Sequence, residues 1–202
     1  MKLYYTPGAC SLTVHIVLNE TGLPYDLGLV DLQTHKTEQG EDFLAINPKG
    51  YVPALELEDK QVLTEVTAIV QYLADRVPDR QLIPVAGGLE RVRLQEWLGF
   101  ISSELHKSFG LLYDPSIPED SKEATLARLM RRFEFLEQHL QNQEYLVGQK
   151  FSVADAYLFN ILFWAAGFGM NFSKLEALST YNDRLAGRPG VQATLQQEGL
   201  SG

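Results

Sequence analysis

The stretch NPKGYVPAL at residues 47–55 decides the fold. Residues 51–55 are typical of the start of a β-strand, yet Pro53 lies among them and cannot donate a hydrogen bond to a neighbouring strand. We therefore expect Pro53 at a sheet edge or bulge, preceded by a cis bond from Val52, since a cis bond before proline costs little. The sharp turn would leave the N–H and C=O of Val52 facing outward. Such an edge can pair with an extended peptide.

A helix is predicted just after this edge, because apolar residues recur at helical spacing from position 69 onward. Thr64 is the expected N-cap, which puts Glu65 in the first helical turn. Backbone N–H groups at a helix start attract carboxylates, and Glu65 could hold an ammonium group. The two segments together suit a short zwitterionic peptide. The alternative is an ordinary edge strand followed by an ordinary capped helix.

The composition describes an acidic globular protein of 202 residues with a net charge of −9, 45% hydrophobic and 21% charged residues. The length suits one large or two modest domains. The negative net charge and the lack of a basic cluster argue against a nucleic-acid partner. The single cysteine excludes an internal disulfide framework and suits a reducing, cytoplasmic compartment. We expect no signal peptide, and the apolar run 156–170 is expected to be a buried helix rather than a membrane span.

The order of elements predicts two domains. Up to about residue 80, the pattern is β-α-β and then β-β-α, with a largely irregular loop at 34–46 that has at most one helical turn. Residues 81–88 form a linker rich in breaking residues, and only helical patterns follow it. The predicted strands are 2–5, 27–32, 52–57 and 61–63, and the predicted helices begin at Ser11, 65, 89, 126, 152, 180 and 191. The helix that begins at 89 is long and is expected to end at Tyr113.

Cys10 is the first candidate for chemistry. It follows the turn at residues 6–9, between a strand and the helix that Ser11 is expected to cap. A helix N-terminus favours a thiolate, so we expect the pKa of this thiol to be lowered. Ligands of open α/β sheets also bind at the carboxyl ends of strands. The alternative is that Cys10 is a small buried hydrophobic residue.

His106 is the second candidate. Gly99, Ser103, His106 and Gly110 are spaced four, three and four residues apart, which predicts one stripe of small or polar side chains on a long helix. His106 would stand in the stripe as a proton donor or acceptor, with Lys107 beside it. The alternative is a helix surface that faces water. No motif for a metal or a phosphate loop is present in the sequence.

Taken together, these motifs resemble those of cytosolic glutathione S-transferases, and within them the bacterial beta class. The resemblance covers essentially the whole chain. The motifs that support it are YTPGACS at 5–11, NPKGYVPAL at 47–55, LTE at 63–65, IVQYLAD at 69–75, ELHK at 104–107 and FSVADAY at 151–157.

The resemblance implies a thioredoxin-like domain at 1–80 with the order β-α-β-α-β-β-α, a linker at 81–88, and an all-helical domain at 89–202 that holds a hydrophobic-substrate pocket. It also implies a homodimer that conjugates reduced glutathione, its co-substrate, to electrophilic small molecules without a metal. Cys10 and His106 would be the catalytic residues. The implied glutathione-binding residues are Cys10, Ser11, His35, Val52, Pro53, Glu65, Val66, Ser103, His106 and Lys107.

Within this set, the main chain of Val52 would pair with the cysteinyl unit of glutathione. Glu65 and the Val66 amide would take the γ-glutamyl end, and His35 would touch the glycyl end. Phe109 and Trp164 are candidates for the wall of the hydrophobic-substrate pocket. Ser152 and Asp155 match the family's capping box, whose role is in folding.

The sequence departs from relatives at Val66, where Gly or Ser is frequent, and at Gly99, which cannot make the contact that an Asn makes across the dimer. Tyr5 lies near the turn, but Cys10 fits the catalytic role better. Two other functions stay open: thiol–disulfide exchange through Cys10, and binding of glutathione or apolar ligands without turnover. The electrophile, isomerase or dehalogenase activity, and whether Cys10 is essential stay open as well.

Overall fold

The computed structural model describes residues 1–201, which form two compact units. The first unit contains residues 1–81 together with residues from 187 onward, and the second contains residues 82–186. The division after residue 81 falls at the start of the expected linker. The C-terminal segment, in contrast, groups with the first unit and not with the helices that precede it.

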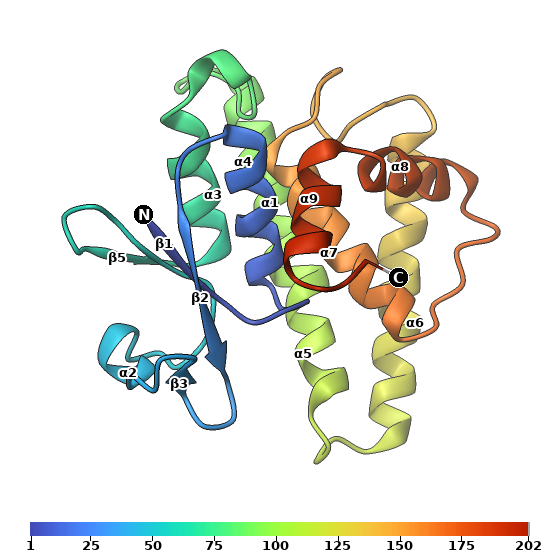
Figure 1. Ribbon diagram of the computed structural model, residues 1–202. Coiled ribbons are helices and arrows are strands. Elements are labelled where there is room, and N and C mark those ends of the chain that lie inside the picture. Colours follow the sequence, from blue (N-terminus) through green and yellow to red (C-terminus); the bar gives the residue numbers. More distant parts are fainter. Residues whose placement is uncertain (202) are drawn as a thin grey trace. The chain divides into compact units, whose positions relative to one another are not determined.

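The first unit has the predicted element order β-α-β-α-β-β-α, with one further short strand, and Figure 1 shows its course. Its elements are β1 (Lys2–Tyr5), α1 (Ser11–Thr21), β2 (Asp26–Asp31), β3 (Lys36–Thr37), α2 (Phe43–Ile46), β4 (Ala54–Glu56), β5 (Val62–Thr64), α3 (Val66–Asp75), η1 (Pro78–Arg80) and α9 (Pro189–Gln197). Strand β3 was missed because its two residues are too few for a recognisable alternation.

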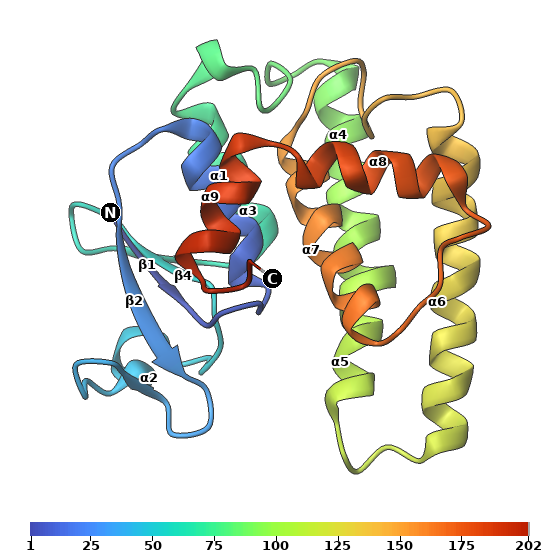
Figure 2. The same cartoon turned by 45° about the vertical axis from the view of Figure 1, so that its right-hand side comes forward.

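The five strands form one mixed sheet in the order β3-β2-β1-β4-β5. The central strand β1 runs parallel to β2 and antiparallel to β4, with Leu3 opposite Leu55. Helix α1 packs against α3 and, on another side, against α9, as Figure 2 shows. The buried side chains of α1 are nearly continuous along the helix, because it is covered by the sheet and by two helices.

Three local predictions in this unit are wrong. Strand β4 begins at Ala54, after Pro53 and not around it. Thr64 pairs with Ala54 at the end of β5, so the N-cap of α3 is Glu65, without a side-chain cap. Ser11 does not cap α1 either, because its hydroxyl group exchanges hydrogen bonds with the main chain of Thr6.

The second unit is helical. Its elements are α4 (Leu89–Phe100), η2 (Ile101–His106), α5 (Lys107–Tyr113), α6 (Glu119–Leu140), α7 (Val153–Gly167) and α8 (Glu176–Ala186). The long helix predicted over 89–113 is continuous, but η2 at its centre is a π-helix. Helix α7 is the predicted buried helix, enclosed on nearly all sides.

The predicted capping box opens α7. The Asp155 carboxylate is fully buried and accepts hydrogen bonds from the Ser152 N–H and hydroxyl, the Leu146 N–H and the Tyr181 hydroxyl, over 2.6–2.9 Å. Four donors converge on one carboxyl group, so the box ties the start of α7 to α8.

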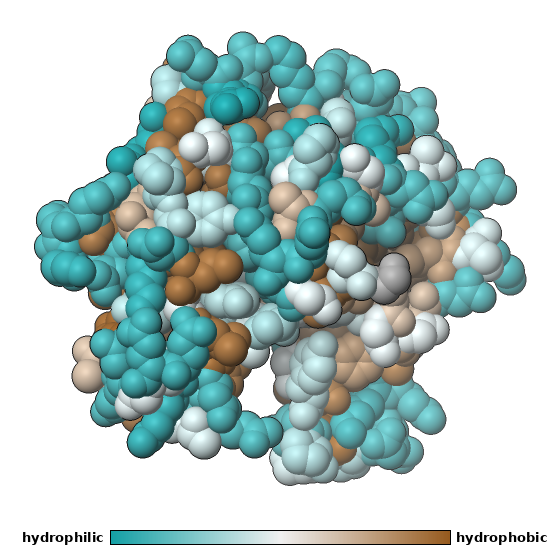
Figure 3. Space-filling view, viewed as in Figure 1, coloured by the Kyte–Doolittle hydropathy of each residue, from teal (hydrophilic) through white to brown (hydrophobic). Residues whose placement is uncertain are grey.

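The surface in Figure 3 is predominantly hydrophilic, with separate hydrophobic patches, as expected of a chain with net charge −9. Among residues 1–201, no helix combines the length and the hydrophobicity that crossing a membrane requires.

Candidate glutathione-binding site

The bond between Val52 and Pro53 is cis, as the sequence predicts. Asn47 anchors the loop before it: its side-chain amide donates to the Tyr51 carbonyl over 2.7 Å, and its own carbonyl accepts from the Gly50 N–H over 2.9 Å. The Val52 side chain packs into the cluster that contains Phe43. The sheet ladder starts only at Ala54, and among residues 1–201 the Val52 N–H has no hydrogen-bond partner. A short main-chain edge therefore lies outside the sheet.

His35 lies next to this loop. Its backbone adopts the left-handed φ of 53°, and its carbonyl accepts from the Phe43 N–H over 2.9 Å. Gly50, with a φ of 75°, is required here because an added Cβ would approach the His35 ring and the Leu44 side chain to 3.2 Å. The ring is half-buried, and its Nδ1 is enclosed without a hydrogen-bond partner among the described residues.

Cys10 is the residue before α1, and its thiol donates to the Val52 carbonyl over 3.1 Å. Sequence reasoning therefore brought together two residues 42 positions apart. The predicted lowering of the thiol pKa is wrong. Burial raises the pKa of Cys10 to about 12, although the N–H groups of Cys10 and Ser11 act to lower it. Loss of water around the sulfur outweighs the helix N-terminus, so the thiol is protonated at neutral pH.

The start of α3 presents Glu65 in an unusual conformation, with φ of 71°. Its carboxylate accepts from Lys49 over 2.6 Å and from the Tyr51 hydroxyl over 2.9 Å. The first hydrogen bonds of the helix come from Ala68 and Ile69 to the Glu65 carbonyl, so the amide groups of Val66 and Thr67 precede the ladder. This is the donor arrangement that binds a carboxylate at a helix start.

In the second unit, His106 ends the π-helical segment η2. Its Nδ1 lies 2.5 Å from the Tyr157 hydroxyl, and its ring contacts Trp164 edge to face with centroids 4.9 Å apart. Both partners come from α7. The imidazole is therefore half-buried and held on two sides by aromatic residues.

The predicted stripe through His106 does not form. Gly99, Ser103 and Gly110 are exposed, whereas His106 turns toward α7. Because a π-helix closes its hydrogen bonds five residues apart, its side chains follow a wider turn than α-helical spacing assumes. Ser103 and Lys107 instead line a groove of about 380 Å³ together with residues of α6. In that groove Arg132 donates to Glu104 over 2.6 Å and Arg128 approaches Ser108.

The assignment of Phe109 to a substrate wall is wrong, since its side chain is fully buried and packs on Trp164 and Phe168. Trp164 is also largely buried. The exposed member of this aromatic group is Tyr113, with 61% of its surface accessible and its ring against Phe168 at 4.9 Å. Sequence reasoning missed Tyr113 because it treated the residue only as the end of a helix.

The structure thus brings Cys10 together with Val52, and it gives Glu65 the partners Lys49 and Tyr51. The last two were missed as site residues although the motif at 47–55 contains them. A lysine and a tyrosine on either side of a tight glycine turn are the available signal. His106 and its unpredicted partner Tyr157 lie within the helical unit, as do Ser103 and Lys107.

Comparison with known proteins identifies the family. The model of the glutathione S-transferase N-terminal domain matches residues 8–76, and that of the C-terminal domain matches residues 100–189. The chain is 46% identical, over 99% of its own length and all of the relative's, to glutathione S-transferase GstA of Escherichia coli O157:H7. The chain belongs to the glutathione S-transferase family.

Two solved structures refine this assignment. A sphingomonad glutathione S-transferase complexed with glutathione is 43% identical, with a TM-score of 0.96 and full coverage of both chains. A beta class glutathione S-transferase of Sphingomonas chungbukensis is 46% identical, with the same TM-score and coverage. The chain is thus a beta class glutathione S-transferase, as its motifs indicate.

Within the part of the chain that the structure describes, no three His, Cys, Asp or Glu side chains gather as a metal site would require.

Proposed function

We propose that the protein conjugates reduced glutathione to electrophilic small molecules and that glutathione binds along the main-chain edge at Val52. The observation that carries the proposal is the edge itself: Val52 directly precedes the cis proline bond, lies outside the sheet ladder, and its carbonyl accepts from the Cys10 thiol over 3.1 Å. A cysteinyl unit laid against Val52 in strand fashion would exchange hydrogen bonds with its N–H and C=O.

The two ends of the tripeptide find complementary groups under this proposal. The amides of Val66 and Thr67 suit the γ-glutamyl carboxylate, and Glu65 suits the ammonium group. His35 is proposed for the glycyl end, supported by the position of its half-buried ring against Gly50, in the loop that leads to Val52. Pro53 fixes the edge, and Ser11 supplies its N–H.

The chemical step needs a glutathione thiolate. Lowering its pKa by one to two units corresponds to about 1.4–2.7 kcal/mol of stabilisation. We assign this stabilisation to the N–H groups at the start of α1, which act in the same direction on Cys10. With a chlorinated aromatic substrate, the thiolate forms a C–S bond, chloride leaves with its electron pair, and the thiol proton passes to solvent. We also propose His106, Ser103 and Lys107 as contributors to glutathione binding or catalysis. This part of the proposal rests only on the resemblance of the sequence to the family.

The raised pKa of Cys10 favours this reaction over thiol–disulfide exchange, because exchange requires the attacking cysteine itself to be a thiolate. For the electrophile we propose flat aromatic compounds, supported by the exposed ring of Tyr113 on the aromatic group with Phe168 and Trp164.

The test is spectrophotometric conjugation of 1-chloro-2,4-dinitrobenzene with reduced glutathione, together with a panel of epoxides and enones. Turnover well above the uncatalysed rate is expected. Tight glutathione binding without turnover on any electrophile would instead support a binding protein.

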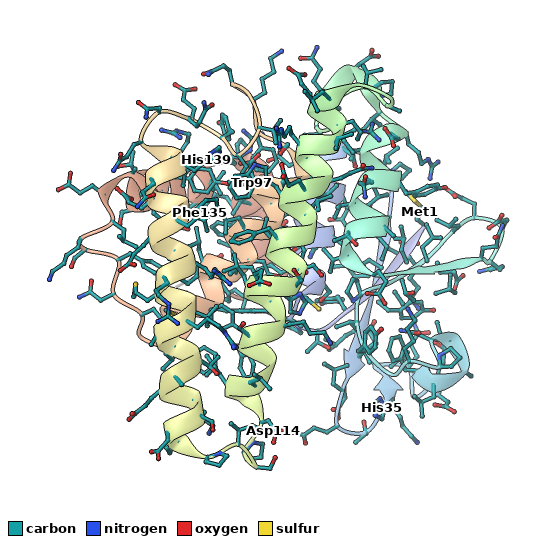
Figure 4. All side chains as sticks on the ribbon, turned by 180° about the vertical axis from the view of Figure 1, so that it is seen from behind. Met1, His35, Trp97, Asp114, Phe135 and His139 are labelled. Carbon is teal, nitrogen blue, oxygen red and sulfur yellow. The ribbon has the colours of Figure 1, made fainter. Side chains whose placement is uncertain are left out.

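We further propose a cytoplasmic homodimer. The lone thiol Cys10 supports the compartment. Exposed apolar side chains on the helical unit support the dimer: Leu89 and Val92 on α4 and Phe135 on α6. Trp97, Phe135 and His139 gather between α4 and α6 in Figure 4. Light scattering after gel filtration tests the assembly, and a monomer at micromolar concentration would contradict it.

A further inference from the structure

A buried polar network in the first unit joins the C-terminal helix to the loop before Cys10. The Glu198 carboxylate, at the end of α9, lies 2.8 Å from His15 Nδ1 on α1 and accepts from the Gly8 N–H over 2.9 Å. The side chains of His15 and Glu198 are completely inaccessible to solvent. Because a carboxylate only accepts, Nδ1 carries the proton that is shared with it.

The other side of the imidazole is also occupied. His15 Nε2 lies 3.0 Å from the Tyr25 hydroxyl, whose oxygen also lies 2.9 Å from Asn19 Oδ1. Both ring nitrogens are therefore fixed, and the carboxylate is aimed at the loop. A charge enclosed in this way is costly unless its hydrogen bonds are complete, so the network depends on each of its members.

Gly8 is the point at which the network meets the candidate site. It has a left-handed φ of 70° in a turn closed by the Ala9 N–H and the Thr6 carbonyl, 3.0 Å apart. Thr6 is tied separately, through its hydroxyl, to the Val30 carbonyl over 2.7 Å. Glu198 therefore holds the half of the loop that leads directly into Cys10 and the start of α1.

We infer that Glu198, oriented by His15, is a positioning residue: it holds the loop at Gly8 so that Cys10 and the N–H groups at the start of α1 stay against Val52. Glu198 lies near the C-terminal end of the chain and still reaches this loop, because α9 lies along α1, as Figure 2 shows. The inference rests on the proposed function only where it predicts an effect on the use of glutathione. Its geometric part concerns Cys10 in the free protein.

A matched control exists in the same helix pair. Asn19 donates to the Thr194 hydroxyl over 2.8 Å, joining α1 to α9 without touching the loop. Thr194→Val removes this acceptor at nearly constant volume. It should lower the melting temperature and leave the loop in place, which separates docking of α9 from positioning of Cys10.

The experiment measures alkylation of Cys10 by iodoacetamide at pH 8 without glutathione, followed by intact mass spectrometry. Cys10 is the sole cysteine, so the adduct reports one position. Glu198→Leu is expected to raise the rate at least tenfold, because the released loop moves the half-buried thiol away from the Val52 carbonyl and into water. Glu198→Gln should stay within about threefold of wild type, since its amide oxygen still accepts from Gly8 and its NH₂ can face the other tautomer of His15. Thr194→Val should stay within about twofold.

In the conjugation assay, Glu198→Leu should lower kcat/KM for glutathione at least tenfold, mostly through KM, and Glu198→Gln should recover most of it. Equal alkylation rates in Glu198→Leu and Thr194→Val, or no recovery by glutamine, would overturn the inference. If the leucine variant does not fold, Glu198→Asp replaces it: its shorter side chain cannot reach both His15 and Gly8, and at least a threefold faster alkylation is expected. Alkylation needs no glutathione, so absence of conjugation in the wild-type protein would count against the proposed function alone.

Discussion

Replacing Glu65 by glutamine removes the charge that we assign to the glutathione ammonium group. The carboxylate is 54% exposed and already paired with Lys49 at 2.6 Å. Hydrogen bonds to charged groups contribute about 1.5–3 kcal/mol. Because the Glu65 carboxylate is exposed, we take the lowest value of this range, about 1.5 kcal/mol, which corresponds to roughly a tenfold change in affinity. The dissociation constant for glutathione should rise about tenfold, with kcat changed less than about twofold, because the lost contact is made equally before and during reaction.

Isothermal titration calorimetry of reduced glutathione measures the effect, and glutaryl-cysteinyl-glycine, which lacks the ammonium group, isolates it. The variant should bind this analogue as the wild-type protein does. Glu58→Gln is the matched control, since Glu58 is also about half exposed and paired with Arg76; its affinity for glutathione should not change. Equal weakening of both ligands by Glu65→Gln would refute the assignment of Glu65 to the ammonium.

Three further predictions follow from the structure. Cys10→Ala should keep conjugation of 1-chloro-2,4-dinitrobenzene within about tenfold of wild type, because the N–H groups at the start of α1 remain; loss of all conjugation would make Cys10 essential. Because the pKa of Cys10 is raised to about 12, its alkylation rate in the wild-type protein should climb roughly tenfold per pH unit through pH 10; a plateau near pH 9 would show an ordinary thiol. Asp155→Ala should lower the free energy of unfolding by about 3 kcal/mol or more, because four buried donors lose their acceptor; urea denaturation measures it, and a loss below about 1 kcal/mol would contradict the account.

Features that depend on short-range chemistry could be predicted from the sequence. The cis bond at Pro53 and the capping box of Ser152 and Asp155 follow from what proline, serine and aspartate can do locally. The position of Cys10 before a helix was readable for the same reason.

Features that depend on packing between residues far apart in the sequence could not be predicted from it. The helix start argues for a lowered pKa at Cys10, but burial by the folded unit reverses the sign. The π-helix before His106 has no periodic signature, so α-helical spacing put Ser103 and His106 on one face when they point apart. The return of α9 to the first unit, which brings Glu198 to Gly8, joins residues 190 positions apart and leaves no trace in any local pattern.

The central claim is that a tripeptide thiol pairs with the main chain of Val52. A crystal structure of the protein with reduced glutathione tests it most directly. The account predicts that the N–H and C=O of Val52 each lie within about 3.2 Å of the cysteinyl main chain, with the glutathione sulfur at the start of α1. Glutathione bound elsewhere, or bound with both Val52 groups unpaired, would contradict it.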